Sequence, residues 1–241
     1  MLRKRGDAPL AWFTDHSLIL LLSIAALFTG FWLYVQRVRL RLRIGWILLL
    51  SPVHVIVGVL CVKVFAALET FSLDGFRNMS LFGAIFLLPL FYWAGAKLSR
   101  RKAADVFDVF TVPTVFTLAC ARVNCLVSGC CLGRIISGTG QRWPTREAEL
   151  VFYAILLPLL ILRGRKKGNE GSLWPVYMAS YGVFRFITEF FRESETNTLF
   201  HLSHLWAILC LLMGVSALLE MNRRKTLASR DSHSLHRRKR T

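Results

Sequence analysis

Acidic residues are scarce in this sequence, and long stretches of it hold no charged residue at all. Among 241 residues there are 14 Asp and Glu against 31 Lys and Arg, and charged residues make up only 19%. Hydrophobic residues make up 54%, and the mean hydropathy is +0.48. A soluble domain of this length must maintain a polar surface and rarely reaches such values. The composition therefore excludes an ordinary soluble domain and indicates a polytopic membrane protein.

The excess of basic residues gives a formal net charge of +17. Such a charge is also typical of nucleic-acid-binding proteins. Here, however, the basic residues stand in blocks between apolar runs, as they do in the cytoplasmic loops of membrane proteins. We therefore expect the membrane as a partner and no nucleic acid.

The apolar runs predict seven membrane-spanning helices. Each is near the roughly 20 residues that a bilayer requires. A basic segment precedes the first run, but no small-residue cleavage site follows it, so we expect a first span rather than a cleaved leader. Internal prolines predict kinks at Pro52, Pro89, Pro113 and Pro158. The predicted spans are residues 18–35, 44–68, 79–96, 106–127, 148–162, 173–191 and 202–219.

The charges of the connections predict the orientation. Basic blocks occupy the first, third and fifth connections and the tail, whereas the alternate connections carry acidic pairs. The positive-inside rule then puts the N-terminus outside and the C-terminus in the cytoplasm, although Arg3, Lys4 and Arg5 disagree. We expect a membrane domain over residues 1–220 and a basic, disordered tail over 221–241. The acidic pairs are Glu69 with Asp74, Glu147 with Glu149, and Glu193 with Glu195.

The sixth predicted span carries a polar stripe. Tyr181, Arg185, Glu189 and Arg192 are spaced by four, four and three residues, which places them on one helical face. Ionisable residues within an apolar span must face other helices or water. One interpretation is structural, with Arg185 and Glu189 neutralising each other and holding helices together. The additional tyrosine and arginine favour a binding site.

Three spans contribute charged residues at the same predicted depth. Arg122 lies near the outer end of the fourth span, Glu149 near the outer end of the fifth, and Arg185 with Glu189 in the outer half of the sixth. Asp108 falls near the inner end of the fourth span. Arginines offer rigid, planar donors suited to phosphate oxygens, and a glutamate would orient them and limit their repulsion. We expect a phospholipid headgroup site and no cofactor.

At these residues the sequence resembles the prolipoprotein diacylglyceryl transferases of bacterial membranes. Residues 181–192, Y-G-V-F-R-F-I-T-E-F-F-R, match the family's Y-G-x-x-R-x-x-x-E-x-x-R. Residues 122–134 are similar to its G-R-[ILV]-G-N-F-[IL]-N-G-E-x-[WY]-G-R, and residues 144–149 to its H-P-[TS]-Q-L-Y-E. Asp108 matches a family aspartate. The resemblance covers about residues 79–213, and the 181–192 segment is its most specific part.

The resemblance implies an enzyme of the bacterial plasma membrane. That family transfers the diacylglyceryl group of phosphatidylglycerol to the thiol of a lipobox cysteine in a prolipoprotein signal peptide and releases glycerol phosphate. The resemblance implies Arg185, Glu189 and Tyr181 as catalytic residues. The substrate-binding residues that it implies are Arg122, Arg192, Gly129, Gly133, Glu149 and Asp108.

The sequence also departs from the family pattern. An ungapped count from Asp108 puts Phe82 where the family has a histidine that helps to deprotonate the thiol. A base is useful because an unperturbed thiol has a pKa of about 8.5, and phenylalanine cannot serve. Cys125 stands in place of an asparagine, Cys130 of a glutamate and Trp143 of a histidine.

The cysteines Cys125, Cys130 and Cys131 leave several interpretations open. Their C-x4-C-C spacing lacks the usual C-x2-C pattern and a nearby histidine, so we expect no metal site. A disulfide would suit an oxidising outer face, and a cysteine could itself accept a lipid group. Small residues in a tight, glycine-flanked turn are the interpretation we favour.

Three functions compete at this stage. The first is a diacylglyceryl transferase-like enzyme with an altered base, for which His204 is a substitute candidate. The second is a non-catalytic relative that binds phospholipid or prolipoprotein as an accessory protein. The third, a small-anion transporter, is disfavoured because no internal repeat or pair of broken helices is apparent.

Overall fold

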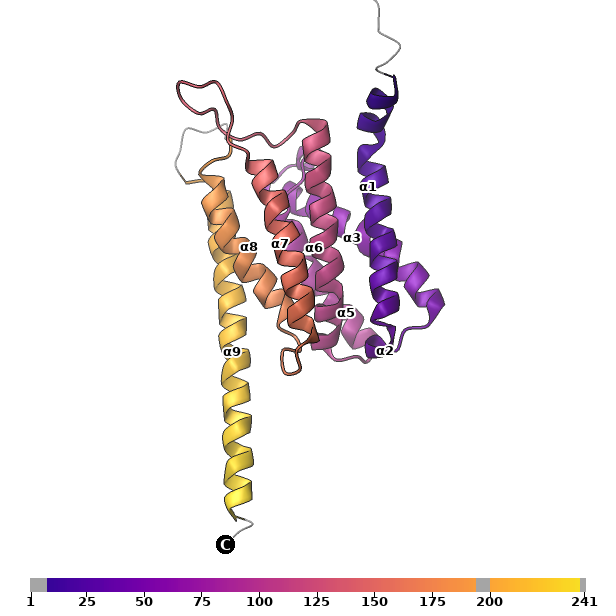
Figure 1. The fold of residues 1–241 in the computed structure, drawn as a ribbon, viewed down its shortest axis with the longest axis vertical. Coiled ribbons are helices and arrows are strands. Elements are labelled where there is room, and N and C mark those ends of the chain that lie inside the picture. Colours follow the sequence, from indigo (N-terminus) through magenta and orange to yellow (C-terminus); the bar gives the residue numbers. More distant parts are fainter. Residues whose placement is uncertain (1–7, 194–199, 239–241) are drawn as a thin grey trace, which may run out of the picture.

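The computed structural model describes the backbone of residues 8–193 and 200–238, and the side chains of 16–76, 78–193 and 200–227. Within these ranges the chain is helical, with two isolated β-bridges. Figure 1 shows the helices as a bundle from which α9 projects. The elements are α1 (Ala8–Val35), α2 (Arg37–Leu40), α3 (Ile44–Thr70), the 3-10 helix η1 (Leu73–Arg77), α4 (Phe82–Phe86), α5 (Leu88–Leu98), α6 (Ala103–Ser128), α7 (Thr145–Arg165), α8 (Leu173–Glu189) and α9 (Leu202–Arg238).

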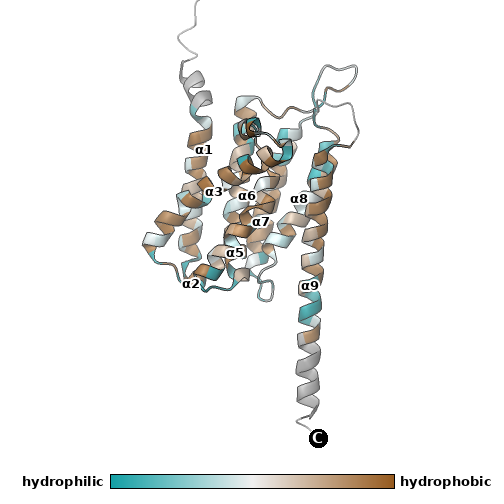
Figure 2. Ribbon diagram, turned by 180° about the vertical axis from the view of Figure 1, so that it is seen from behind, coloured by the Kyte–Doolittle hydropathy of each residue, from teal (hydrophilic) through white to brown (hydrophobic). Residues whose placement is uncertain are grey.

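The prediction of an all-helical membrane protein is confirmed at this level. Four helical segments of the described chain are long and apolar enough to cross a membrane. Apolar residues run along the bundle, and hydrophilic ones lie toward its ends and on the projecting part of α9 (Figure 2). The four segments are His16–Val35, Ile44–Thr70, Ala103–Ser128 and Leu202–Leu227.

The predicted third span, residues 79–96, is helical from Phe82 and is interrupted at one residue. The structure has the short helices α4 and α5, which meet at Leu87. Pro89 lies in the first turn of α5, where its missing N–H is tolerated. A helix continuing through this point would lose a hydrogen bond to the proline and clash with its ring. Leu87 keeps a right-handed helical conformation, with φ −95° and ψ −37°, so the chain kinks here as Pro89 predicts, and α4 is the turn before the kink.

The prediction of a disordered tail after residue 220 also differs from the structure, in which α9 continues to Arg238. Glu220 pairs with Arg224 one turn later, with 2.8 Å between Oε1 and Nε. Such i,i+4 pairs support a helix, and no proline interrupts this segment. Residues 239–241 lie outside the described residues. So do Arg3, Lys4, Arg5 and Glu195, whose charges entered the prediction of the orientation.

Two glycines bring α8 and α9 into close contact. A Cβ on Gly182 of α8 would lie 2.6 Å from the backbone nitrogen of Leu211, and one on Gly214 of α9 would lie 2.5 Å from that of Ala179. Small residues let helix backbones approach in membranes, where packing replaces the hydrophobic drive. These contacts fix the position of α8, the helix that carries the polar stripe.

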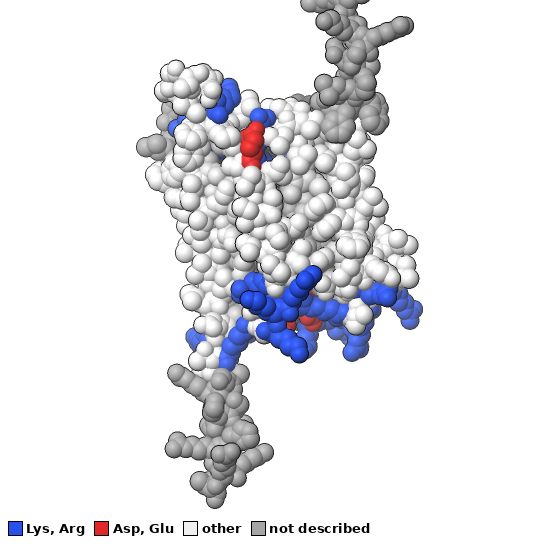
Figure 3. All heavy atoms as spheres, viewed as in Figure 1, with Lys and Arg blue, Asp and Glu red and all other residues white. Residues whose placement is uncertain are grey.

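The two ends of the bundle differ in charge. Lys and Arg gather at the lower end in Figure 3, over α2, the α5–α6 connection and the end of α7. We call this the basic end. Buried Asp108 of α6 lies here: its carboxylate accepts hydrogen bonds from Gly171 N at 2.7 Å and Leu173 N at 3.1 Å, and from Arg39 Nη2 at 2.8 Å. It thus ties α2 and the start of α8 to α6.

Candidate functional site

The other end of the bundle holds a group of buried charges from three helices. Arg122 is in the last two turns of α6, Glu149 in the first turns of α7, and Arg185 and Glu189 in the last turns of α8. Arg192 follows three residues after α8 ends. We call these five residues the arginine cluster. The spacing and depth that the sequence predicts do bring these five residues together.

The carboxylates link the arginines in a chain of ion pairs. Arg122 Nε lies 2.8 Å from Glu149 Oε1, and Arg185 Nη1 lies 3.9 Å from Glu149 Oε2. Glu189 Oε2 lies 2.8 Å from Arg185 Nη2 and 3.9 Å from Arg192 Nε. Each glutamate therefore stands between two arginines, as expected of groups that orient cations and limit their repulsion.

The cluster holds more positive than negative charge in a buried place. The side chains of Arg122, Glu149 and Arg185 are only 6%, 3% and 9% exposed. Three arginines face two glutamates, so one positive charge is in excess. Repulsion from Arg185, then burial and Arg122, lowers the pKa of Arg192. An anion bound here would relieve this repulsion.

Several polar atoms of the cluster remain available to a ligand. In the described part of the chain, Arg185 Nε and Nη1 and the Tyr181 hydroxyl are buried without a hydrogen-bond partner, and Arg122 Nε approaches Glu149 without hydrogen-bond alignment. Buried donors of this kind are costly unless something accepts from them. Tyr181, placed one turn before Arg185, thus belongs to the same site.

Phe82 lies against this group. Its ring stands edge-on to Tyr181, with 6.0 Å between centroids, and the Arg185 guanidinium carbon is 5.8 Å from its centroid. Phe82 is the first residue of α4, the turn before the kink at Leu87. The position where the sequence departs from the family pattern is therefore inside the site, and it offers a cation–π contact instead of an acid–base group.

The loop after α6 forms a wall of the site. Gly129 ends α6 with φ +70°, a left-handed conformation that glycine adopts without strain. Gly133 forms a β-bridge with Arg192, and a Cβ there would lie 2.0 Å from the Trp143 carbonyl oxygen. Arg134 N donates to the Phe191 carbonyl at 2.8 Å. Both glycines therefore shape the loop that holds Arg192 in place.

Asp108 is not part of the cluster. It lies fourteen residues before Arg122 on α6, which is roughly 21 Å along a helix axis. Its oxygens are used by Arg39 and by the start of α8. The structure brings Tyr181 and Gly133 to the five charged residues of the cluster and places Gly129 at the end of α6. Asp108 lies apart, because its match to the family concerned sequence and not depth.

Sequence reasoning missed two residues of the site. The buried Tyr153 hydroxyl donates to Glu149 Oε1 at 3.4 Å, and its i+4 spacing from Glu149 on α7 was a usable signal. Half-buried Glu69, at the end of α3, interacts electrostatically with Arg185 and Glu189. That contact joins residues far apart in sequence, and no local pattern marks it.

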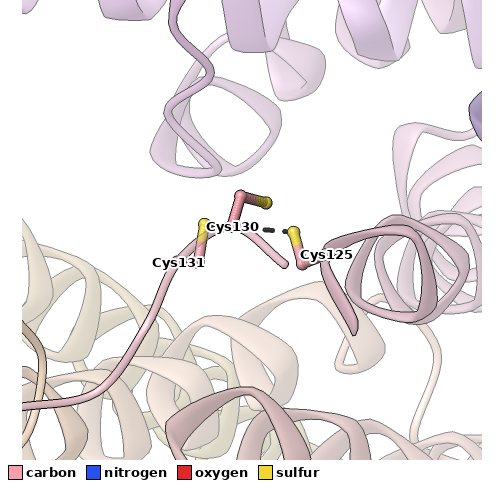
Figure 4. Close-up of side chains that lie close together, drawn as sticks. All are labelled: Cys125, Cys130 and Cys131. Atoms are coloured by element: carbon pink, nitrogen blue, oxygen red, sulfur yellow. Dashed lines mark hydrogen bonds between the residues drawn. The ribbon is translucent and has the colours of Figure 1, made fainter. Parts of the chain in front are cut away.

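The three cysteines lie close together, Cys125 at the end of α6 and Cys130 with Cys131 in the loop that follows (Figure 4). Their Sγ atoms are all within 4.8 Å of one another, and those of Cys125 and Cys131 are 3.9 Å apart. Each of the six cysteines is free. Cys131 has φ 58°, which turns its thiol back toward Cys125. Three thiols this close are able to hold a soft metal ion, an arrangement that the spacing did not predict.

His204, the substitute base candidate, is enclosed by aromatic rings. Its ring centroid is 4.5 Å from that of Phe190 and 5.5 Å from that of Phe186. Its Nδ1 accepts a hydrogen bond from the His201 backbone N–H at 3.1 Å. These contacts favour a packing role at the start of α9.

The family model described as prolipoprotein diacylglyceryl transferase matches residues 16–220. The chain is similar to proteins named phosphatidylglycerol–prolipoprotein diacylglyceryl transferase from three organisms. For Dehalococcoides mccartyi the identity is 25% over 135 residues, covering 49% of this chain and 52% of the relative. For Polaromonas naphthalenivorans it is 30% over 133 residues, covering 49% of each.

The third relative, from Cupriavidus metallidurans, is 26% identical over 165 residues, which cover 64% of this chain and 58% of that protein. The chain thus spans about half the length of the curated relatives it matches.

Proposed function

The chain belongs to the prolipoprotein diacylglyceryl transferase family, and on that premise we propose that it moves a diacylglyceryl group from phosphatidylglycerol to a lipobox cysteine thiol. The names of its relatives support this donor and this acceptor. The single observation that carries the proposal is the arginine cluster, with its excess positive charge and its unpartnered Arg185 donors. The arginines would hold the phosphate, and the glutamates would keep them in place.

The charge of the cluster suits the reaction. The phosphodiester of phosphatidylglycerol carries one negative charge, which the guanidinium groups of the three cluster arginines can bind. The thiolate sulfur forms a bond to the diacylglycerol carbon that carries the phosphate oxygen, and the bond between that carbon and that oxygen breaks. Glycerol phosphate then leaves with a second negative charge. Buried guanidinium groups stabilise such developing charge strongly, because little water screens them.

The thiol proton needs an acceptor, and Phe82 offers none. We assign this role to a carboxylate of the cluster, Glu149 or Glu189, because these are ionisable acceptors at the site where the phosphate would bind. Tyr181 would donate to the phosphate through its unpartnered hydroxyl. Arg122 and Arg192 complete the binding surface, and Gly129 and Gly133 shape the loop beside it. Asp108 acts at a distance, by fixing the start of α8.

We further infer seven spans in a bacterial plasma membrane, with the N-terminus outside and the basic end in the cytoplasm. The spans would be α1, α3, the α4–α5 pair, and α6 to α9. Loop charge and the basic end of Figure 3 support this orientation. Residues 1–220 would form the membrane domain and 221–241 a basic extension. The test of this orientation uses two variants with a single cysteine each, one in the α5–α6 connection and one in the α6–α7 connection. When intact cells are treated with an impermeant thiol reagent, only the cysteine in the α6–α7 connection should react.

A reconstituted assay tests the activity. Purified protein, phosphatidylglycerol vesicles and a lipobox peptide should yield a diacylglyceryl-peptide, detected by mass. Arg185→Ala should abolish the product, whereas Arg165→Ala, an exposed arginine at the basic end, should not change it. If the wild type binds phosphatidylglycerol but forms no product, the protein is an accessory relative and the proposal is wrong.

A further inference from the structure

A second candidate lipid site lies at the basic end, away from the arginine cluster. A chamber of about 500 Å³ opens between α3, α5 and α6. Its walls are apolar, and this volume is within the usual range of ligand pockets. We call it the α3–α5 pocket. Its wall residues include Leu50, Val53, Val57, Leu88, Phe91 and Phe110.

Two arginines line the pocket as well. Arg41 stands in the α2–α3 connection and Arg101 in the α5–α6 connection. Neither forms an ion pair with any residue whose side chain is described. Nearby Arg39 is different, because Asp105 and Asp108 lie 2.7 and 2.8 Å from its nitrogens. The pocket therefore has positive charge at its edge that the protein itself does not neutralise.

The polar groups deep in the pocket satisfy one another. The Tyr92 hydroxyl lies 3.3 Å from His54 Nδ1 and 2.8 Å from Thr114 Oγ1, within hydrogen-bonding distance of both. The wall therefore presents mainly apolar atoms to an occupant. Together with the arginines at the edge, it suits a ligand that has an apolar body and a negatively charged end.

We propose that the α3–α5 pocket binds an anionic phospholipid of the leaflet at the basic end, with an acyl chain in the chamber and the phosphate between Arg41 and Arg101. Basic pockets between membrane helices bind anionic headgroups, and guanidinium groups suit phosphate oxygens. The chain would fill the space between α3 and α5, which have few direct contacts. This site is independent of the proposed catalysis, since it lies at the opposite end of α6.

Gly95 allows the pocket to be filled without a clash. It lines the chamber on α5, and a Cβ there would meet nothing within 4 Å. Gly95→Leu would occupy the space of the acyl chain, and leucine favours a helix more than glycine does. Gly58 of α3 also has open space around it but does not line the pocket. Gly58→Leu is therefore the matched control.

The charge is tested by a second pair of variants. Arg41→Gln with Arg101→Gln removes both pocket arginines, and Arg43→Gln with Arg100→Gln removes the same charge from neighbours that do not line the pocket. Each basic residue near an anionic surface contributes about fivefold in binding, so the first pair should weaken binding by roughly thirtyfold. The second pair should change it far less.

The measurement is the lipid retained by full-length protein released from nanodiscs that contain equal amounts of phosphatidic acid and phosphatidylethanolamine, read by native mass spectrometry. Wild type and Gly58→Leu should retain one more phosphatidic acid than Gly95→Leu and the Arg41/Arg101 pair do. Arg185→Ala should keep it, which separates this site from the arginine cluster. Retention by Gly95→Leu, or equal loss in both arginine pairs, would overturn the proposal.

Discussion

The two ends of α6 both bury charge, and they satisfy it differently. At the basic end, Asp108 is 1% exposed, and its two oxygens accept hydrogen bonds from Arg39 and from two backbone N–H groups of the α8 start. At the other end, Arg122 and Arg185 meet glutamates, yet several of their N–H groups and the Tyr181 hydroxyl have no acceptor among the described residues. At the basic end, a buried charge whose hydrogen bonds are all made by the protein holds helices together. At the other end, buried arginines that keep free donors can bind an anion.

The same contrast is visible in single arginines. Burial opposes the charge of Arg39, but its hydrogen bonds to Asp105 and Asp108 outweigh this effect and raise its pKa. Arg192 at the cluster has its pKa lowered, first by repulsion from Arg185. The number of arginines at one end of the bundle therefore does not indicate a binding site. What indicates it is whether acidic partners in the protein fully compensate those arginines.

Removal of one cluster carboxylate should have the largest effect. Glu149→Gln leaves Arg122 and Arg185 without their shared counter-charge, and an uncompensated buried charge costs about 3–5 kcal/mol. Thermal unfolding in detergent and the transfer assay measure the loss of stability and product. Glu147→Gln, an exposed neighbour, is the control. An unchanged melting temperature would mean that Arg122 and Arg185 do not depend on Glu149 to compensate their charge.

The substitution Phe82→His should raise activity. It places an acid–base group beside Arg185 and Tyr181, and such groups contribute about a hundredfold to ten-thousandfold in rate. Initial rates of diacylglyceryl-peptide formation check this. Phe86→His, which packs near Trp206 one turn further on, should give no gain. A lower rate in Phe82→His would show that the ring matters for packing and that the position is wrongly matched to the family histidine.

At the basic end, Asp108→Asn should cost stability but little chemistry. The amide keeps one acceptor and loses the ion pair with Arg39, so a loss of about 1–3 kcal/mol is expected. Asp105→Asn should cost less because that side chain is 24% exposed. Activity per folded molecule should be unchanged. A large fall in activity per folded molecule would mean that Asp108 is a substrate-binding residue, as the family resemblance implies.

The thiols report on the positive field of the cluster. A hydrogen bond from Cys125 lowers the pKa of Cys131, and Arg192 and Arg122 add to this against the effect of burial. The thiolate should therefore persist as the pH falls below the ordinary value of about 8.5. Iodoacetamide labelling followed by peptide mass analysis should show Cys131 still reacting at mildly acidic pH, and more slowly in Arg192→Gln. Complete labelling without reductant would exclude a disulfide.

The smallest effect is expected at the surface. Arg142 Nη1 lies 2.7 Å from Glu193 Oε2, but both side chains are substantially exposed, and such pairs contribute less than about 1 kcal/mol. A double-mutant cycle with Arg142→Ala and Glu193→Ala, measured by thermal unfolding, should give a coupling within that bound. A larger value would mean that the loop around Gly133 depends on this pair to hold Arg192.

Local spacing predicted the cluster well, for a physical reason. The four-four-three spacing of the α8 stripe survives in any α-helix, and loop charge placed Arg122 and Glu149 at the same depth. Asp108 was assigned to substrate binding by family resemblance, although the depth argument already put it at the inner end. Glu69 could not be predicted, since only the folding of α3 against α8 and α9 brings it near. Pro89 predicted the kink between α4 and α5, because a proline removes a helical hydrogen bond and its ring clashes with the preceding turn.

The glycine contacts between α8 and α9 have a mechanical consequence. The apolar part of α9, residues 202–219, is roughly 27 Å long, close to the thickness of the hydrocarbon layer, and a helix of this length follows changes in that thickness by tilting. Because Gly182 and Gly214 let the α8 and α9 backbones touch, we expect a tilt of α9 to be passed on to α8 and to Arg185.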